Sequence, residues 1–185
     1  MIRRGFRSVI VLAALALLGG CAEFYRPAEG PVGEAHRPRL EAAWAQAQIG
    51  YGAQWRIYVR ATDPDGDLDR VWITFTRFGG TYPGTFVYLP GDPRREVNGY
   101  IQMWAVPRGG MHFGQMDIHA TAEVRVEDRA GNMSAPRSFP FTLVLLRVPD
   151  KGEPPAGFAR EARLAEMGMT MEIDLGAGDD KGGGN

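Results

Sequence analysis

The stretch that decides the fold runs from Trp55 to Phe75. It reads Trp-Arg-Ile-Tyr-Val-Arg-Ala-Thr, then Asp63-Pro-Asp-Gly-Asp67, then Leu-Asp-Arg-Val-Trp-Ile-Thr-Phe. Apolar and polar residues alternate on both sides of a five-residue segment that contains three carboxylates, a Pro and a Gly. A period of two is typical of half-buried β-strands, and Pro, Gly and Asp are turn-forming residues. The stretch therefore predicts two strands joined by a short acidic loop.

Further segments repeat this pattern of short strands between turn signals. In the clearest of them, 118–127, apolar residues alternate with polar ones throughout, and a closing strand follows over 138–148. An Ala-rich first segment, 40–48, suits a strand or a helical turn equally well. Strands at this spacing predict a sandwich or barrel, and we expect an all-β antiparallel sandwich of about seven strands over residues 38–148. Its expected core comprises Trp55, Ile57, Val59, Val71, Ile73, Phe75, Val124, Val126, Phe139, Phe141 and Leu143.

Two motifs in this region are similar to motifs of known domains. Trp55-x-Ile-x-Val-x-Ala-x-Asp-Pro-Asp-Gly-Asp67 resembles the second strand and following loop of bacterial immunoglobulin-like domains, as also seen in polycystic-kidney-type and cadherin-like repeats. Val124-x-Val-Glu-Asp-Arg-Ala-Gly-Asn-Met-Ser134 resembles the end of such domains. The resemblance covers roughly residues 50–148 and implies an immunoglobulin-like β-sandwich. A fold of this kind does not by itself imply a function.

The N-terminus carries the signals of export. Three Arg residues precede an unbroken apolar run over 9–18, which is too short to span a hydrocarbon core of about 30 Å. Residues 1–20 are therefore expected to be a signal peptide. Leu18-Gly-Gly-Cys21 resembles the lipobox of bacterial lipoproteins, which implies that Cys21 becomes the acylated first residue of the mature chain and that the lipid bilayer is a partner. Ala22 follows the Cys, which by the same resemblance implies sorting to the outer membrane.

The segments on either side of the expected sandwich differ from it in composition. Residues 21–37 contain Pro and Gly without a period and are expected to form a tether between lipid and domain. Residues 149–185 form an acidic, Gly-rich tail with eight acids and four bases, most of which we expect to be disordered. Within the tail, 158–167 suits a short helix. After it, the period of two from Met167 to Leu175 indicates a strand that adds to an edge of the sandwich or to another protein.

Charge and cysteine content exclude several classes of protein. Cys21 is the only cysteine, so the exported domain has no intramolecular disulfide and depends on its core. Without residues 1–20 the chain has 18 basic and 22 acidic residues, a net charge of −4. This acidity argues against nucleic acid as a partner.

The acidic loop is the candidate metal site. Asp63, Asp65 and Asp67 stand at alternate positions around Gly66 and offer the hard oxygen ligands that Ca²⁺ prefers. Alternatively, the aspartates only form a turn, because their side chains readily cap their own backbone. Asp128 and Asn132 would join the site only if their loop lies at the same end of the sandwich.

Catalytic residues are not evident in the sequence. The three histidines have no metal-ligand spacing, and a triad of Ser134 or Ser138 with His119 and Asp117 lacks a recognised nucleophile motif. We therefore expect a non-enzymatic interaction or structural module of the cell envelope with an envelope protein as partner. The alternative is a Ca²⁺-dependent module that binds glycans or peptides, for which the expected exposed aromatics are Tyr58, Trp72, Tyr82 and Tyr88.

Overall fold

The computed structural model describes residues 28–50, 53–77, 80–92, 94–108, 117–144 and 152–172. The predictions for the signal peptide 1–20 and for Cys21 lie outside this part of the chain. One short 3-10 helix, η2 (Glu34–His36), precedes the strands. The strands are β1 (Arg39–Ala45), β2 (Gln48–Gly50), β3 (Gln54–Thr62), β4 (Leu68–Arg77), β5 (Gly80–Tyr88), β6 (Glu96–Arg108), β7 (Ile118–Asp128), β8 (Arg137–Val144) and β9 (Arg163–Glu172).

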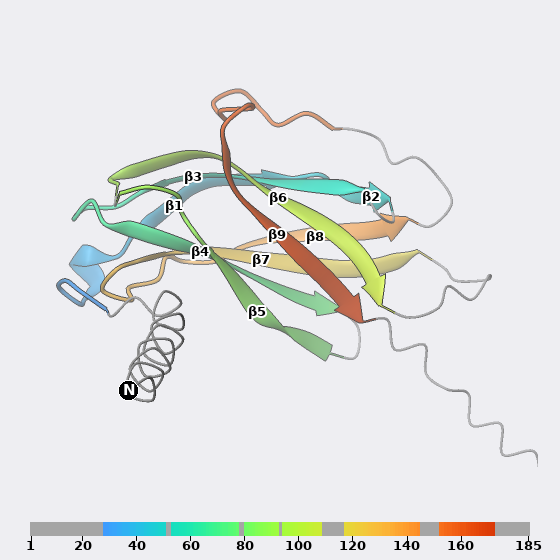
Figure 1. Cartoon of the computed structure of the whole chain (residues 1–185), viewed down its shortest axis with the longest axis horizontal. Coiled ribbons are helices and arrows are strands. Elements are labelled where there is room, and N and C mark those ends of the chain that lie inside the picture. The colour runs from blue at the N-terminus through green and yellow to red at the C-terminus, as the bar shows by residue number, and fades with distance from the viewer. Residues whose placement is uncertain are drawn as a thin grey trace, which may run out of the picture.

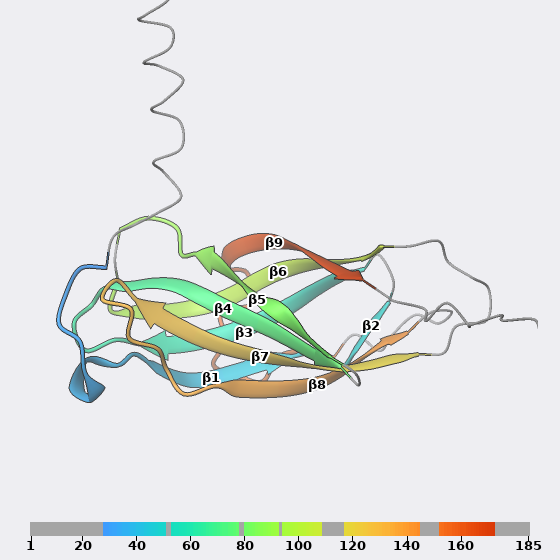
Figure 2. The ribbon, with the colours of Figure 1, turned by 90° about the horizontal axis from the view of Figure 1, so that it is seen from below.

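The strands form two sheets that pack face to face (Figures 1 and 2). One sheet has the order β1-β3-β6-β9 and the other β2-β8-β7-β4-β5. In immunoglobulin terms, β1-β3-β6 take the places of strands A, B and E, and β8-β7-β4-β5 take those of G, F, C and C′. The chain is thus an immunoglobulin-like β-sandwich, as the sequence motifs imply.

The core lies between the sheets, where the period-two alternation places one apolar face of each strand. Trp55 is fully buried at its centre, with ring centroids 4.6 Å from Phe141 and 6.2 Å from Phe75. Its indole N–H donates a 3.0 Å hydrogen bond to the carbonyl of Gln46, so the buried polar atom is satisfied. Of the eleven residues expected in the core, ten are buried and Phe139 is partly buried against the same cluster.

Two strands, β2 and β9, differ in position or pairing from the sequence prediction. The first segment splits into β1 and β2, so the chain changes sheets, and β2 pairs in parallel with β8. β9 arises from the predicted tail and pairs in parallel with β6, at the place of strand D (Figure 1). The predicted antiparallel sandwich is confirmed, with parallel pairing only at β2–β8 and β6–β9 among the described strands.

The tail prediction is corrected for residues 152–172. Residues 156–161 form turns rather than the start of a helix, and 163–172 form β9. The alternating methionines from Met167 onward had indicated this edge strand, because a period of two places alternate side chains on one face. Met167 accordingly belongs to the buried core.

Residues 152–162, here called the C-terminal strap, cross the outer face of the β1-β3-β6-β9 sheet before β9 begins. Phe158 packs edge-on against the buried ring of Tyr58, whose other ring neighbours are Trp44 and Tyr100. Asn98 fastens the strap with two hydrogen bonds: its Nδ2 donates to the Gly157 carbonyl at 3.0 Å, and its Oδ1 accepts from the Ala159 N–H at 2.9 Å.

Candidate metal centre

The β3–β4 loop is organised by Asp63. Its Oδ2 accepts hydrogen bonds from the backbone N–H groups of Gly66 at 2.6 Å and Asp67 at 3.0 Å, which is the local capping expected of a turn-forming aspartate. Gly66 supplies the positive φ of 84° that the bend requires. The other oxygen, Oδ1, is buried and has no hydrogen-bond partner among the described residues. Asp63 thus forms the turn with one oxygen atom and leaves the other available.

The β7–β8 turn lies at the same end of the sandwich and brings in a third carboxylate. Asp128 is fully buried, and its two oxygens accept hydrogen bonds from Asn132, at 2.8 Å from the backbone N–H and 2.7 Å from Nδ2. The two loops are joined directly by a 3.1 Å bond from the Arg129 N–H to the Asp67 carbonyl. This condition for Asp128 and Asn132 to approach the acidic loop is therefore met.

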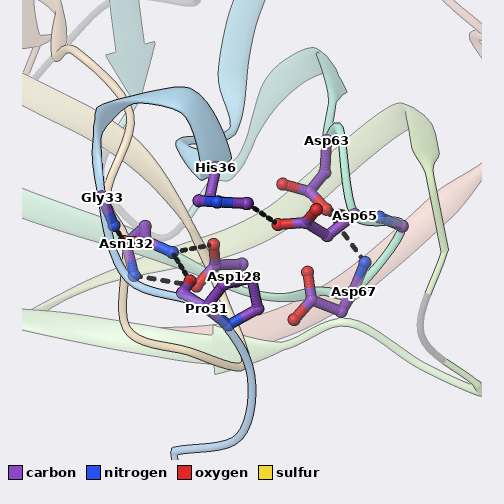
Figure 3. A network of polar contacts seen from close by, with 9 residues as sticks. Pro31, Gly33, His36, Asp63, Asp65, Asp67, Asp128 and Asn132 are labelled. Carbon is purple, nitrogen blue, oxygen red and sulfur yellow. Dashed lines mark hydrogen bonds and ion pairs between the residues drawn. The ribbon is translucent and has the colours of Figure 1, made fainter.

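Carboxylate oxygens of Asp63, Asp67 and Asp128 lie within 4.8 Å of one another (Figure 3). Asp67 Oδ1, like Asp63 Oδ1, is buried without a hydrogen-bond partner among the described residues. Asp65 does not join this group. Its Oδ2 instead lies 2.8 Å from Nδ1 of His36, and the pair is partly exposed. Of the three aspartates predicted as ligands, two converge, and Asp128 stands in the position expected for the third.

Burial beside other carboxylates raises the pKa of Asp67 to about 6 from its ordinary 3.8. The largest cause is burial, which disfavours the charged form. A hydrogen bond that protonated Asp67 can donate to Asp63 adds to it, and so does repulsion from Asp63, Asp128 and Asp65. A carboxyl group in this state is destabilised at neutral pH, because its charge is incompletely compensated.

Residues 28–37, here called the linker segment, cover the acidic end instead of extending away from it (Figures 1 and 3). The Gly33 N–H donates to Asn132 Oδ1 at 3.0 Å, and Asn132 Nδ2 donates to the Pro31 carbonyl at 3.0 Å. The Glu29 N–H donates to the Arg129 carbonyl at 2.9 Å. The prediction that residues 21–37 are only a tether is wrong for this part. This docking could not be predicted from the sequence, because the linker segment makes most of these contacts through its backbone.

Ser134, one of the serines considered as a nucleophile, does not approach His119. Ser134 is buried, and its Oγ is used in hydrogen bonds with the backbone of Val126 and Ala135. His119 is exposed and pairs with Thr142 at the other end of β7. Seven residues of strand separate His119 from Val126, which corresponds to about 23 Å. Ser134 and His119 therefore do not form a nucleophile and base.

The predicted aromatic binding face is also rearranged. Tyr58 is buried beneath the C-terminal strap. Trp72 packs on Phe86 at 4.8 Å on the outer face of β4 and β5, and Arg70 lies over the rings of Phe86 and Tyr88. The side chain of Tyr82 lies outside the described part.

Comparison with known proteins gives likenesses of fold. No family model matches the chain, and no curated protein matches it. Among solved structures, the chain is similar to the PKD domain of an M14-like peptidase from a Thermoplasmatales archaeon, at 15% identity and a TM-score of 0.35, covering 58% of this chain and 95% of that one. It is also similar to the fibronectin(III)-like modules of Clostridium thermocellum CbhA, at 16% identity and a TM-score of 0.34. That match covers 65% of this chain and 53% of the other.

A third similar structure is the CARDB domain of a Pyrococcus furiosus protein in complex with di-metal ions. It has 12% identity and a TM-score of 0.31, and the match covers 66% of this chain and 98% of that one. The fold assignment for this chain rests on its own strand order. Over the described residues, no helix has the length and apolar character needed to cross a membrane.

Proposed function

We propose that this chain is a lipid-anchored, non-enzymatic module of the cell envelope whose acidic end binds Ca²⁺. The observation that carries the cation site is a pair of buried oxygens, Asp63 Oδ1 and Asp67 Oδ1, that have no hydrogen-bond partner among the described residues. They belong to carboxylates that approach the buried carboxylate of Asp128 within 4.8 Å. Buried polar atoms are nearly always satisfied, so such a pair points to a missing positive partner.

Calcium fits this donor set. Ca²⁺ takes oxygen ligands at 2.3–2.6 Å, so a single ion reaches oxygens on opposite sides that are about 5 Å apart. The carboxylate oxygens of Asp63, Asp67 and Asp128 fall within that span. Oxygens that already accept one hydrogen bond retain a lone pair for a metal. Because Asp63 Oδ2 already accepts two hydrogen bonds, the three carboxylates supply three to five ligands, and water would complete the coordination.

The anchoring part of the proposal is supported by the sequence. Leu18-Gly-Gly-Cys21 after a basic and apolar leader indicates acylation of Cys21 and, with Ala22, an outer-membrane address. An immunoglobulin-like sandwich held off the membrane suits binding of an envelope protein through its exposed sheet surfaces. Cys21→Ser is expected to move the protein from the membrane to the soluble periplasmic fraction, because each buried methylene of an acyl chain contributes about 0.8 kcal/mol. Retention of the variant in membranes would show another anchor.

Thermal unfolding in millimolar Ca²⁺ and in chelator tests the cation site. An ion that binds only the folded state stabilises it by about 2.7 kcal/mol at a hundredfold excess over its Kd. Asp128→Asn should remove most of the rise in Tm, whereas Asp65→Asn, outside the cluster, should retain it. Mg²⁺ serves as an ionic control, because it requires shorter bonds and octahedral geometry. Equal melting of the unmodified protein in Ca²⁺ and in chelator would refute the site.

One observation favours ligand binding as a second candidate function. A groove of about 690 Å³ lies where the end of β1, β2 and the start of β3 meet the C-terminal strap. Its lining includes Trp44, Gln48, Gln54, Arg56 and Glu161. Aromatic, amide and charged groups together suit a glycan or a peptide. Gln54 begins β3 whereas Asp63 follows its end, about 30 Å away along the strand, so binding here would be independent of Ca²⁺. Titration with glycan and peptide libraries, using Trp44→Ala as control, tests it.

A further inference from the structure

Gly30 brings the linker segment against the acidic cluster. A Cβ atom at this position would lie 3.4 Å from Asp67 Oδ2 and 3.3 Å from the Cβ of Ala130. Gly30 has a φ of 125°, which L side chains rarely adopt. The backbone of the linker segment therefore passes directly over a cluster carboxylate, and it contributes to removing Asp67 from water.

Asn132 connects the same segment to a second cluster carboxylate. Its side-chain amide bonds both the carbonyl of Pro31 and the N–H of Gly33, two residues apart, as a neighbouring strand would. The same Nδ2 donates to Asp128 Oδ2. His36 adds a contact to Asp65 at the edge of the loop. Each of these contacts of the linker segment is therefore made with a residue of the acidic loop or of the β7–β8 turn.

We infer that Ca²⁺ fastens the linker segment, residues 28–37, to the sandwich, so that the cation determines how the domain is held on its N-terminal anchor. The inference rests on the proposed function, since it requires a cation at Asp63, Asp67 and Asp128. Cation binding at that site would then control whether the backbone of residues 28–37 is docked on the sandwich.

The physical reason is the cost of covering like charges. Closing the linker segment over three carboxylates buries negative charge, which is unfavourable unless a cation is present. With Ca²⁺ bound, the charge that the closure covers falls from −3 to −1, and Asn132 adds hydrogen bonds to the linker segment. Coupling of this kind is reciprocal: a bound cation favours the closed segment, and a closed segment raises cation affinity by the same factor.

Amide hydrogen exchange of the mature chain in detergent micelles tests the coupling. The N–H groups of Glu29 and Gly33 report the closed segment, because each donates to the β7–β8 turn. Their exchange should slow at least about tenfold in millimolar Ca²⁺ relative to chelator, which corresponds to about 1.4 kcal/mol. The N–H of Ala159, which donates to Asn98 in the C-terminal strap, is the internal control and should not respond to Ca²⁺.

A pair of glycine variants tests the reciprocal effect. Gly30→Ala places a methyl group against Asp67 and Ala130 without altering a carboxylate, and it should weaken Ca²⁺ binding about tenfold. Gly157→Ala is the matched control: Gly157, in the C-terminal strap, also has a positive φ, 100°, but its neighbour is the side chain of Arg60 in β3. The Gly157→Ala protein should bind Ca²⁺ as the unmodified protein does.

The outcomes separate the two proposals. If Ca²⁺ raises the Tm but exchange at Glu29 and Gly33 is unchanged, or if Gly30→Ala leaves the Ca²⁺ Kd unchanged, the coupling is refuted and the cation site stands. If Ca²⁺ leaves the Tm unchanged, the cation site and the coupling are refuted together. Slower exchange at both amides with unchanged exchange at Ala159 supports the coupling.

Discussion

The two terminal segments of this domain are fastened by the same device in different surroundings. Asn132 holds the linker segment and Asn98 holds the C-terminal strap, each by accepting from one backbone N–H and donating to the carbonyl two residues earlier. A side-chain amide thereby takes the place of a neighbouring strand. The surroundings differ, because Asn132 is buried and bonded to Asp128, whereas Asn98 is exposed.

The difference shows how one hydrogen-bonding motif serves two purposes. The strap is secured by packing: Phe158 lies on Tyr58, and the Ala162 carbonyl accepts from the Tyr100 N–H where β9 begins. The linker segment is held by hydrogen bonds to the β7–β8 turn and lies over charged groups. Its attachment is therefore expected to depend on pH and cations, whereas attachment of the strap depends on close contact.

The largest effect is expected where the strap crosses Gly99. A Cβ atom there would lie 2.3 Å from the Ala162 carbonyl oxygen and 2.9 Å from Leu164 Cγ, so Gly99→Ala must displace the strap from β6. We expect a loss of about 3–5 kcal/mol of unfolding free energy in urea denaturation. Gly168→Ala, in β9 itself with no atom within 4 Å of its Cβ, is the control and should be tolerated. Equal stability of the two variants would contradict the role of close contact.

Removing each asparagine compares the two attachments directly. Asn132→Ala leaves the buried Asp128 carboxylate without its side-chain donor and should cost about 2–3 kcal/mol in chelator. Asn98→Ala removes two exposed hydrogen bonds to the backbone and should cost about 1 kcal/mol. Chemical denaturation at pH 7 measures both. If the two substitutions lower the unfolding free energy equally, the buried charge of Asp128 does not make the attachment of the linker segment different from that of the strap.

A smaller effect is expected from the titration of Asp67. Its pKa is raised to about 6 from the ordinary 3.8, so between these values the folded state binds more protons than the unfolded state. This group therefore makes the cation-free protein more stable as pH falls from 7 to 4, and the contribution is lost as pH rises through 6. Asp67→Asn should remove this dependence, which is seen by subtracting its stability profile from that of the unmodified protein. Ca²⁺ should raise the Tm less at pH 5 than at pH 7.5.

The smallest effect is expected at the edge of the linker segment. His36 and Asp65 form a pair at 2.8 Å with side chains 37% and 30% exposed, so solvent screens the interaction. His36→Ala should cost less than about 1 kcal/mol, and the difference should shrink in high salt. A larger loss, or one that salt does not reduce, would show that His36 carries more of the attachment than Asn132 does.

The alternation in the sequence was sufficient for the sandwich but not for its two ends. Val124 and Trp55 lie in strands whose period of two specifies the buried face, and both are in the core. β9 was ambiguous, because Gly and Met in a polar tail have weak strand preference and its pairing with β6 is distant in sequence. The sequence alone could not place Asp128 beside Asp63 and Asp67, because only the strand order determines which loops lie at the same end of the sandwich. The Pro and Gly residues of the linker segment indicate a tether, because composition does not reveal the hydrogen bonds that its backbone makes.

The position of β9 also governs when folding can finish. β6 ends at Arg108 and its edge partner begins at Arg163, so a chain made from its N-terminus has an incomplete sheet until after β8 has appeared. During that interval β6 presents a row of unpaired N–H and C=O groups, which is a template for pairing with a strand of another molecule. Until β9 is added, a partly made chain therefore keeps this edge open and is prone to aggregate through it.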